Sequence, residues 1–547
     1  MMLSYANGAA ERPLLGETIG HNLERTAARV PDRDALVSCH QGLRYTYAEF
    51  NAAVDLLACG MLAAGLGQGD RAGIWSPNRA EWPLVQYATA KLGVILVNLN
   101  PSYRPSELAY ALKQSDCRWL LAAPDYKGSS FVEMVQDVRP GLPALERVVF
   151  FGSEDWDALA AAPVDADALR AGMAELDFDD PINIQYTSGT TGFPKGATLT
   201  HHNILNNGRL VAGLLGYTEA DRVCIPVPLY HCFGMVMGNL GATNYGACMV
   251  YPAEAFDPEA TLTACAQERC TSLYGVPTMF IAQLDHPRFA EHDLSTLRTG
   301  IMAGSPCPVE VMKRVSSEMG IKEISIAFGM TETSPVTTQV RIDDTLEHRC
   351  GTVGQVMPHT EIKIVAVGGP ESGRTQPRGE PGEFLARGYA VMRGYWNDPE
   401  RTAEAIDAAR WMHSGDLATM DEDGYVRIVG RIKDMIIRGG ENVYPREIEE
   451  FLYTHAEIAD VQVIGVPDRR YGEELMAWVL PRRNAALTED QVREFCRGQI
   501  AHYKIPRYVK FVDEFPMTVT GKIQKYKMRE QAIEELGLDE IAAIATA

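Results

Sequence analysis

The chain has 547 residues, which is too many for one ordinary hydrophobic core, so two or more domains are expected. Hydrophobic residues make up 46% of the chain and charged residues 22%, a composition typical of a globular protein and not of a disordered or fibrous one. The net charge of −21 disfavours nonspecific binding to nucleic acid or to an anionic membrane, because both require a basic surface.

The cysteines and the N-terminus indicate the compartment. Eleven cysteines are scattered without a CxxC pair, and the closest two are Cys265 and Cys270. This pattern favours free thiols in a reducing compartment over a disulfide framework or a zinc site. The first 25 residues include Glu11 and lack an apolar run of signal-peptide length. We therefore expect a cytoplasmic location.

The N-terminal part alternates helical and strand patterns. Thr46 and Glu49 match a capping box and predict a helix start. Apolar segments predict strands at residues 72–75, 93–98, 119–123, 148–151 and 325–328. This alternation predicts an α/β architecture. Residues 234–251 are uncharged, but four glycines and two asparagines make them too polar for a membrane span, so we expect a buried helix beside a ligand pocket.

The pattern changes after residue 351. Predicted strands at 362–365 and 382–387 flank a loop rich in glycine and proline, which indicates a small β-rich subdomain over about residues 351–432. A strand then leads into a charged turn at 431–434, where we place a domain boundary. A helix at 446–453 and strands at 461–466 and 476–480 follow. The expected domains are therefore 1–432 and a small α+β domain, 433–547.

The most informative segment combines hydroxyl residues, glycines and a lysine: Thr187, Ser188, Gly189, Thr190, Thr191, Gly192, Phe193, Pro194, Lys195 and Gly196. Hydroxyls and backbone N–H groups donate to phosphate oxygens, and lysine adds positive charge. The NTPase loop pattern fails, because Pro194 stands where its second glycine belongs and Gly196 follows the lysine. A solvated loop is the alternative, but a strand pattern at 182–186 and a capped-helix pattern at 198–205 flank the segment. We interpret it as a phosphate-binding loop.

Five further segments carry polar groups suited to a nucleotide. Residues 328–332 follow a strand and offer an aromatic face for a purine, a hydroxyl for a phosphate and the Glu332 carboxylate for Mg²⁺. Asp416 follows a glycine and is placed to accept ribose hydroxyls. The other three are Arg431, the pair Gly439 and Gly440, and Lys522 near the C-terminus. Each has an ordinary alternative when taken alone: a turn residue, a surface ion pair or a solvated charge.

Together and in this order, the loop and these segments resemble the adenylate-forming family, which includes acyl-CoA synthetases, adenylation domains of peptide synthetases and firefly luciferase. The resemblance covers nearly the whole chain. Within the family, the chain is most similar to medium-chain fatty acyl-CoA ligases of the acyl-CoA synthetase family member 2 kind. Four segments carry that likeness: 228–232, 274–280, 434–442 and 504–506.

The resemblance implies a reaction in two steps. A carboxylate oxygen attacks the α-phosphorus of ATP and expels pyrophosphate, and the thiol of coenzyme A then attacks the acyl adenylate to give a thioester and AMP. ATP, Mg²⁺ and coenzyme A are the implied cofactors and co-substrates, with a carboxylic acid as the partner molecule. In the first step an anion attacks an anion, so positive charge and oriented donors are required.

The resemblance also implies residue roles around the nucleotide. Residues Thr187 to Lys195 hold the β- and γ-phosphates, Thr331 contacts the α-phosphate and Glu332 binds Mg²⁺. The implied adenine site is lined by Gly304, Ser305, Phe328 and Gly329. The family usually has tyrosine where this chain has Phe328, so stacking is kept and a phenol contact is lost. Asp416 and Arg431 hold the ribose.

Domain movement and the acyl pocket complete the implied site. Lys522 bridges the acyl carboxylate and the α-phosphate, and rotation of the mobile C-terminal domain about the hinge Lys433 replaces it with the loop at Gly439 and Gly440. His231 gates the acyl pocket. The candidate pocket lining is Met235, Val236, Val276, Met279, Met302, Met330 and Val336; at these spacings the residues fit an ordinary core equally well.

The identity of the acid stays open at this point. A straight medium-chain fatty acid is the expected substrate, and a bulky specialised-metabolite acid such as a polycyclic terpenoid carboxylate is the alternative. Loading of a carrier protein in place of coenzyme A, a catalytically dead adenylate-binding regulator and a luciferase-like oxidase are further alternatives. The presence of Gly439, Glu332 and Lys522 argues against the first two. A homodimer is an expectation from the family.

Overall fold

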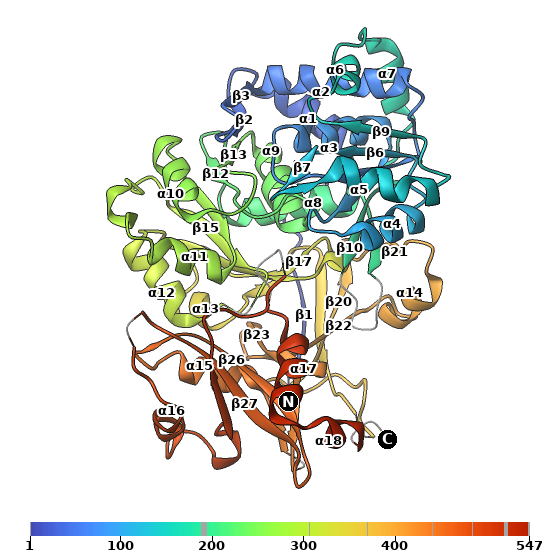
Figure 1. Ribbon diagram of the computed structural model, residues 1–547. Helices are drawn as coiled ribbons and strands as arrows, with labels where there is room; N and C mark the ends of the chain where they lie inside the picture. Colours follow the sequence, from blue (N-terminus) through green and yellow to red (C-terminus); the bar gives the residue numbers. More distant parts are fainter. Residues whose placement is uncertain are drawn as a thin grey trace.

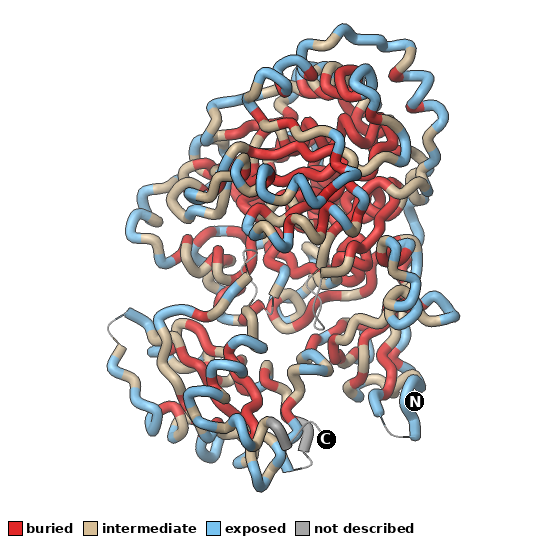
Figure 2. Tube along the Cα trace, turned by 45° about the vertical axis from the view of Figure 1, so that its right-hand side comes forward, coloured by how far each residue is buried: buried red, intermediate tan, exposed pale blue. Residues whose placement is uncertain are grey.

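The computed structural model of the chain describes residues 2–187, 194–305, 307–368, 370–439, 441–483, 485–518 and 523–544. In Figure 1 the segments coloured from blue to yellow form a larger body, and the C-terminal segments in dark orange and red form a smaller one beside it. The buried parts of the chain gather inside each body in Figure 2. The predicted α/β class is confirmed.

Two sheets dominate the larger body. The first has the order β21 (Gly394–Tyr395), β11 (Lys195–Thr200), β10 (Pro181–Thr187), β5 (Ile95–Leu99), β4 (Arg71–Trp75), β6 (Trp119–Ala122) and β9 (Arg147–Phe150). From β10 to β9 the strands are parallel, whereas β11 and β21 join antiparallel. Parallel strands covered on both faces are mostly apolar, as β4 and β6 are, and the buried polar residues Asn98, Asn183 and Gln185 of β5 and β10 are hydrogen-bonded.

The second sheet has nine strands, in the order β18 (Gln355–Val356), β17 (Val336–Gln339), β16 (Glu323–Gly329), β15 (Thr299–Ala303), β14 (Ser272–Gly275), β12 (Arg222–Cys224), β13 (Cys248–Tyr251), β2 (Asp34–Ser38) and β3 (Leu43–Thr46). Helix α2 (Tyr47–Ala63) contacts β2 and β3 of this sheet, and its neighbour α3 (Glu81–Leu92) contacts β4 and β5 of the first sheet. The helices therefore form a layer between the two sheets.

The remaining helices of the larger body are α1 (Ile19–Arg29), α4 (Pro105–Gln114), α5 (Phe131–Val138), α6 (Glu154–Ala160), α7 (Ala166–Ala174), α8 (His201–Leu214), α9 (Gly241–Tyr245), α10 (Pro258–Gln267), α11 (Pro277–Leu284), α12 (Val309–Glu318), α13 (Leu346–Gly351) and α14 (Pro399–Ala405). The predicted capping box is confirmed: Thr46 and Glu49 cap each other at the start of α2. Strand β11 runs to Thr200, so the helix expected within 198–205 begins only at His201, with Thr200 as its cap.

A third, antiparallel sheet covers the region predicted to be rich in strands. Its order is β1 (Tyr5–Asn7), β19 (Thr360–Val365), β20 (Gly382–Gly388), β22 (Met412–Met420) and β23 (Val426–Arg431). The sequence patterns did not predict β1, which pairs with β19 from the far end of the chain. The N-terminus is thereby held against the sheet that leads into the C-terminal part.

The smaller body is built on its own sheet, with the order β25 (Glu441–Val443), β24 (Ile436–Arg438), β27 (Gly472–Pro481) and β26 (Ile458–Asp468), and with β28 (Tyr508–Phe511) beside β27. Its helices are α15 (Pro445–Leu452), α16 (Glu489–Cys496), α17 (Lys525–Leu536) and α18 (Asp539–Ile544). Separate apolar clusters around Val463 and around Trp478 form its core. Arg446 of α15 donates to the Ile428 carbonyl of β23 over 3.1 Å, so the two bodies are in contact.

The uncharged segment 234–251 is more divided than the predicted single helix. It contains most of a π-helical stretch, η2 (Phe233–Leu240), then the short α9, and finally strand β13. Gly246 ends the helix in a left-handed conformation, which lets the chain turn into the strand. Within the described residues, no helix is both long and apolar enough to cross a membrane.

Candidate active site

The phosphate-binding loop predicted from the sequence connects two paired strands. β10 and β11 form an antiparallel hairpin in which Thr187 lies opposite Lys195, and Thr187 Oγ1 donates to the Lys195 carbonyl at 3.5 Å. The hairpin therefore holds the two ends of the loop side by side, where β10 ends and β11 begins. The predicted residues Ser188, Gly189, Thr190, Thr191 and Gly192 lie outside the described part of the chain.

Glu332 lies beside the ends of this loop. It belongs to a short 3₁₀ turn, η4 (Thr331–Thr333), directly after β16, and both Thr331 and Glu332 are buried. Thr187 Oγ1 is 3.4 Å from Glu332 Oε1, and the hydroxyl of Tyr395 donates to the same oxygen at 2.8 Å. The Lys195 ammonium lies 4.6 Å from the centre of the Tyr395 ring. The loop ends and the predicted acidic residue thus share one cluster.

Tyr395 was not among the residues predicted from the sequence. It reaches the cluster because β21 pairs with β11, with Tyr395 opposite Ala197. Burial and the neighbouring Glu332 carboxylate raise the pKa of Tyr395 well above its usual range, so the phenol stays protonated and acts as a donor. The only sequence signal for it was an aromatic residue after a glycine in a short segment that precedes a helix.

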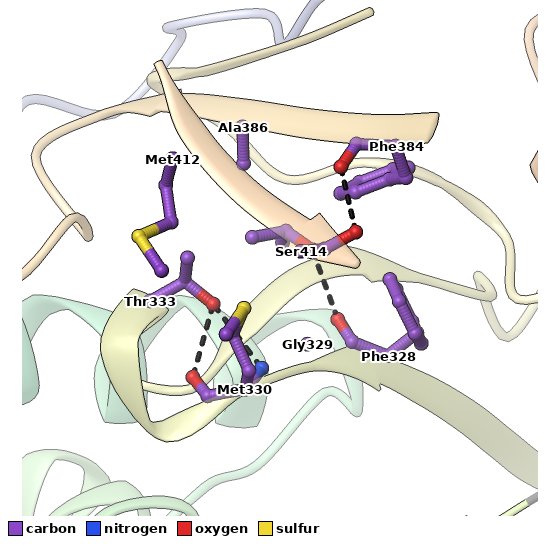
Figure 3. Close-up of a pocket in the computed structure, with 9 residues that line it drawn as sticks. Phe328, Gly329, Met330, Thr333, Phe384, Ala386, Met412 and Ser414 are labelled. Atoms are coloured by element: carbon purple, nitrogen blue, oxygen red, sulfur yellow. Dashed lines mark hydrogen bonds between the residues drawn. The ribbon is translucent and has the colours of Figure 1, made fainter. Parts of the chain in front are cut away.

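Phe328 stands at the end of β16 and faces the antiparallel sheet. Its ring meets Phe384 of β20 edge to face, with centroids 5.2 Å apart and planes at 86°. Figure 3 shows these rings beside a small cavity of about 10 Å³, lined by Phe328, Gly329, Met330, Thr333, Thr337, Phe384, Ala386, Met412 and Ser414. This volume is about that of one water molecule, so a purine does not fit inside it.

Gly304 and Ser305 follow β15, the strand next to β16. Gly304 has a φ of +89°, a conformation that favours glycine, and a Cβ there would lie 3.2 Å from Val276 Cγ1. Gly329 is required for a different reason, since a Cβ would lie 1.8 Å from the Pro335 carbonyl oxygen. The two glycines therefore let the ends of β15 and β16 lie close to the Val276 side chain and to the Pro335 backbone, respectively.

Asp416 and Arg431 are brought together as direct partners on β22 and β23. Arg431 Nε donates to Asp416 Oδ1 at 3.0 Å; the Asp416 side chain is 10% exposed and that of Arg431 is 53% exposed. The exposed guanidinium can therefore reach a ligand while the carboxylate is held in place. Glu383, which the sequence patterns did not single out, accepts from the Gly415 N–H and pairs with His413, and so orders the turn before Asp416.

The predicted hinge and the second-step loop lie just beyond β23. Lys433 is exposed in the short turn η5 (Ile432–Asp434). Gly439 has a φ of +61°, and its N–H donates to the Tyr471 carbonyl at 2.8 Å. Gly440 and Lys522 lie outside the described residues.

The candidate pocket residues divide between two apolar clusters. Met235, Val236, Val276, Met279 and Val336 are buried in one cluster, and Met330 packs against it. Met302 lies instead in the cluster around the nine-stranded sheet. Six of the seven residues therefore belong to or border the same apolar core, which extends through much of the larger body.

The structure adds polar neighbours to this region. Gln185 donates to the Met235 sulfur at 2.9 Å and accepts from the Cys232 N–H, which ties the pocket segment to β10. His231 is half-buried at the start of that segment, with its Nδ1 3.3 Å from the Phe233 nitrogen.

Comparison with known families decides the identity of this arrangement. The family model for AMP-binding enzymes matches residues 23–396, and the model for the C-terminal domain of AMP-binding enzymes matches residues 447–522. The chain belongs to the AMP-binding enzyme family. It is an AMP-forming acyl-CoA synthetase, which adenylates a carboxylic acid with ATP and then forms a thioester with coenzyme A.

Similar proteins support this assignment over nearly the full length. The enzyme is 49% identical to putative acyl-CoA synthetase YngI of Bacillus subtilis, over 96% of this chain and 99% of the relative. It is 42% identical to human mitochondrial medium-chain acyl-CoA ligase ACSF2, over 98% of this chain and 91% of the relative. Among solved structures, the anthranilate CoA ligase AuaEII in complex with anthranoyl-AMP superposes with a TM-score of 0.85 at 27% identity, covering 95% and 98% of the two chains.

Proposed function

We propose that this synthetase activates medium-chain fatty acids. The observation that carries the proposal is that the candidate pocket residues Met235, Val236, Val276, Met279 and Val336 are uncharged, buried and part of one apolar core. A lining of this kind favours an unbranched alkyl chain, and the methionines adapt to chains of different length. The names of two relatives, a medium-chain acyl-CoA ligase and a fatty acyl CoA synthetase of Mycobacterium tuberculosis, support the same substrate class.

The residue roles around ATP belong to the same proposal. The loop ends at Thr187 and Lys195 hold the terminal phosphates, Thr331 contacts the α-phosphate, and Asp416 with Arg431 holds the ribose. Phe328 stacks on the adenine outside the small cavity, with Gly304, Ser305 and Gly329 on the same side. The support is that Thr187 ends β10, that Phe328 and Thr331 lie at and just after the end of β16, and that Arg431 ends β23 and pairs with Asp416 of β22. The ends of neighbouring strands are where α/β proteins commonly bind ligands.

Mg²⁺ is the proposed metal cofactor. The donors present fit it, because Glu332 supplies a carboxylate and Thr187 a hydroxyl within 3.4 Å of each other, and Mg²⁺ takes oxygen ligands with substrate phosphates and water completing the set. When bound, the ion neutralises charge on the phosphates. The chain's own part is to hold Glu332 in place through the Tyr395 hydroxyl and to hold the Lys195 ammonium over the Tyr395 ring.

The C-terminal part acts in the proposed alternation of two states. Lys522 bridges the acyl carboxylate and the α-phosphate in the first step, and rotation about Lys433 then brings Gly439 and Gly440 to the coenzyme A channel. His231 gates the acyl pocket. A cytoplasmic location and a homodimer complete the proposal. The absence of any disulfide among the described residues supports the location.

A pyrophosphate-release screen tests the substrate. Hexanoate, octanoate, decanoate and dodecanoate are compared with acetate, palmitate, benzoate and a polycyclic terpenoid carboxylate, each with and without coenzyme A. We expect the highest kcat/KM for octanoate or decanoate and an acyl-CoA product only with coenzyme A. Preference for an aromatic or polycyclic acid would overturn the substrate class, and transfer only to a carrier protein would overturn the acceptor.

A further inference from the structure

Three cysteines that the adenylating site does not use lie together in the core. Cys224 ends β12, Cys265 lies in the last turn of α10, and Cys270 follows that helix just before β14. Their sulfur atoms all lie within 4.8 Å of one another. The three residues are 0–1% exposed, and none is in a disulfide. The fold thus buries three thiols together, away from solvent.

We propose that Cys224, Cys265 and Cys270 form a three-coordinate site for a soft monovalent metal ion, Cu(I). Three sulfurs bound to one metal ion at about 2.3 Å are about 4 Å apart, a spacing that the observed cluster accommodates. Cysteine thiolates select Cu(I), zinc and iron–sulfur clusters over harder ions. The inference does not depend on which acid the enzyme activates.

The number of ligands separates Cu(I) from zinc. Structural zinc sites have four protein ligands, and catalytic ones add a water to three. In the described part of the chain, the group of His, Cys, Asp and Glu ligands here has three members. Complete burial of all three leaves no exposed position for a water ligand. A trigonal site with three sulfurs remains.

The surroundings provide an approach to the three cysteines from the protein surface. Arg222 lies two residues before Cys224 on β12. Arg222 also lines a surface hollow of about 560 Å³, together with Arg44, Gln267, Glu268, Arg269 and Thr271. The segment 267–271 that borders this hollow contains Cys270, so the hollow lies on the outer side of the cluster.

Metal binding joins elements that lead to the acyl pocket. Each thiol that becomes a ligand releases its proton to solvent, and no electron is transferred. The bound ion links α10 to β12, which continues toward His231, and to the start of β14, which continues into Val276. Because the ion binds the folded state, occupancy raises the melting temperature of the enzyme.

The test titrates Cu(I), without oxygen, into the reduced full-length enzyme in competition with the chelator bicinchoninate. We expect one equivalent to bind. Cys224→Ala and Cys270→Ala should each weaken binding by more than the roughly 10–100-fold that loss of an outer-shell partner costs. The matched control is Cys117→Ala, which removes a buried thiol from a different part of the core and should leave affinity unchanged. Pyrophosphate release by each variant checks folding.

A second measurement covers the case in which the variants fail to fold. X-ray absorption of the wild-type enzyme loaded with one equivalent of Cu(I) should show three sulfur neighbours and no nitrogen or oxygen. The assignment is overturned by absence of competition with the chelator, by affinity that both cluster variants retain, by nitrogen or oxygen neighbours, or by tighter retention of Zn²⁺ than of Cu(I).

Discussion

The hydroxyl of Tyr395 donates to Oε1 of Glu332 over 2.8 Å, although 63 positions separate the two residues in sequence. The Tyr395 ring also lies 4.6 Å from the Lys195 ammonium. One side chain therefore touches both an acidic and a basic residue of the predicted phosphate site. Since Tyr395 is fixed by pairing of β21 with β11, the hairpin that carries the loop also positions Glu332.

Tyr395→Phe should slow adenylation without unfolding the enzyme. The substitution keeps the ring beside Lys195 and removes a hydrogen bond to a charged group, worth about 1.5–3 kcal/mol. We expect a roughly 10- to 100-fold loss in pyrophosphate release and a higher Mg²⁺ requirement. Tyr217→Phe is the control, because that buried hydroxyl contacts Ser272 instead. Equal effects of the two substitutions would show that the loss is only structural.

Glu332→Gln should raise the Mg²⁺ concentration needed for half-maximal adenylation and lower the rate. The amide keeps the size of the side chain but removes the charge that a hard cation prefers. Initial rates over a Mg²⁺ titration measure both effects. Kinetics identical to those of the wild type across the titration would remove Glu332 from the proposed metal site.

Lys522→Ala should separate the two half-reactions. Loss of the positive charge at the carboxylate and α-phosphate should reduce adenylate formation by roughly a hundredfold or more. Thioester formation from a presynthesised acyl adenylate should be largely spared. Both steps are followed separately by stopped assays of pyrophosphate and acyl-CoA. Equal loss in the two steps would contradict the assigned role.

The His413–Glu383 pair should make stability depend on pH. The hydrogen bond from His413 to Glu383 raises the pKa of the histidine above its ordinary value of about 6.5. Its stabilising contribution is therefore fully present below about pH 6.5 and is lost as pH rises through the raised pKa. His413→Gln should lower the melting temperature more at acidic than at alkaline pH. If the melting temperatures of the wild type and the His413→Gln variant differ by the same amount at every pH, this coupling is excluded.

Local patterns in the sequence predicted much of the chain because they depend on neighbouring residues. Thr46 and Glu49 are three positions apart and cap one helix, and the apolar runs at 72–75 and 119–123 became β4 and β6 with small shifts at their ends. The order of the nucleotide motifs predicted the family and its reaction, which the comparisons confirmed. No tertiary contact was needed for these inferences.

Contacts between distant segments were decided only by the tertiary structure. Pairing of β21 with β11 brings Tyr395 to Glu332, pairing of β1 with β19 returns the N-terminus to the third sheet, and packing of α10 against β12 gathers Cys224 with Cys265. The physical reason is that strand pairing and core packing are determined by how apolar surface is buried over the whole domain. A side chain's neighbours across the sheet therefore do not follow from its neighbours along the chain.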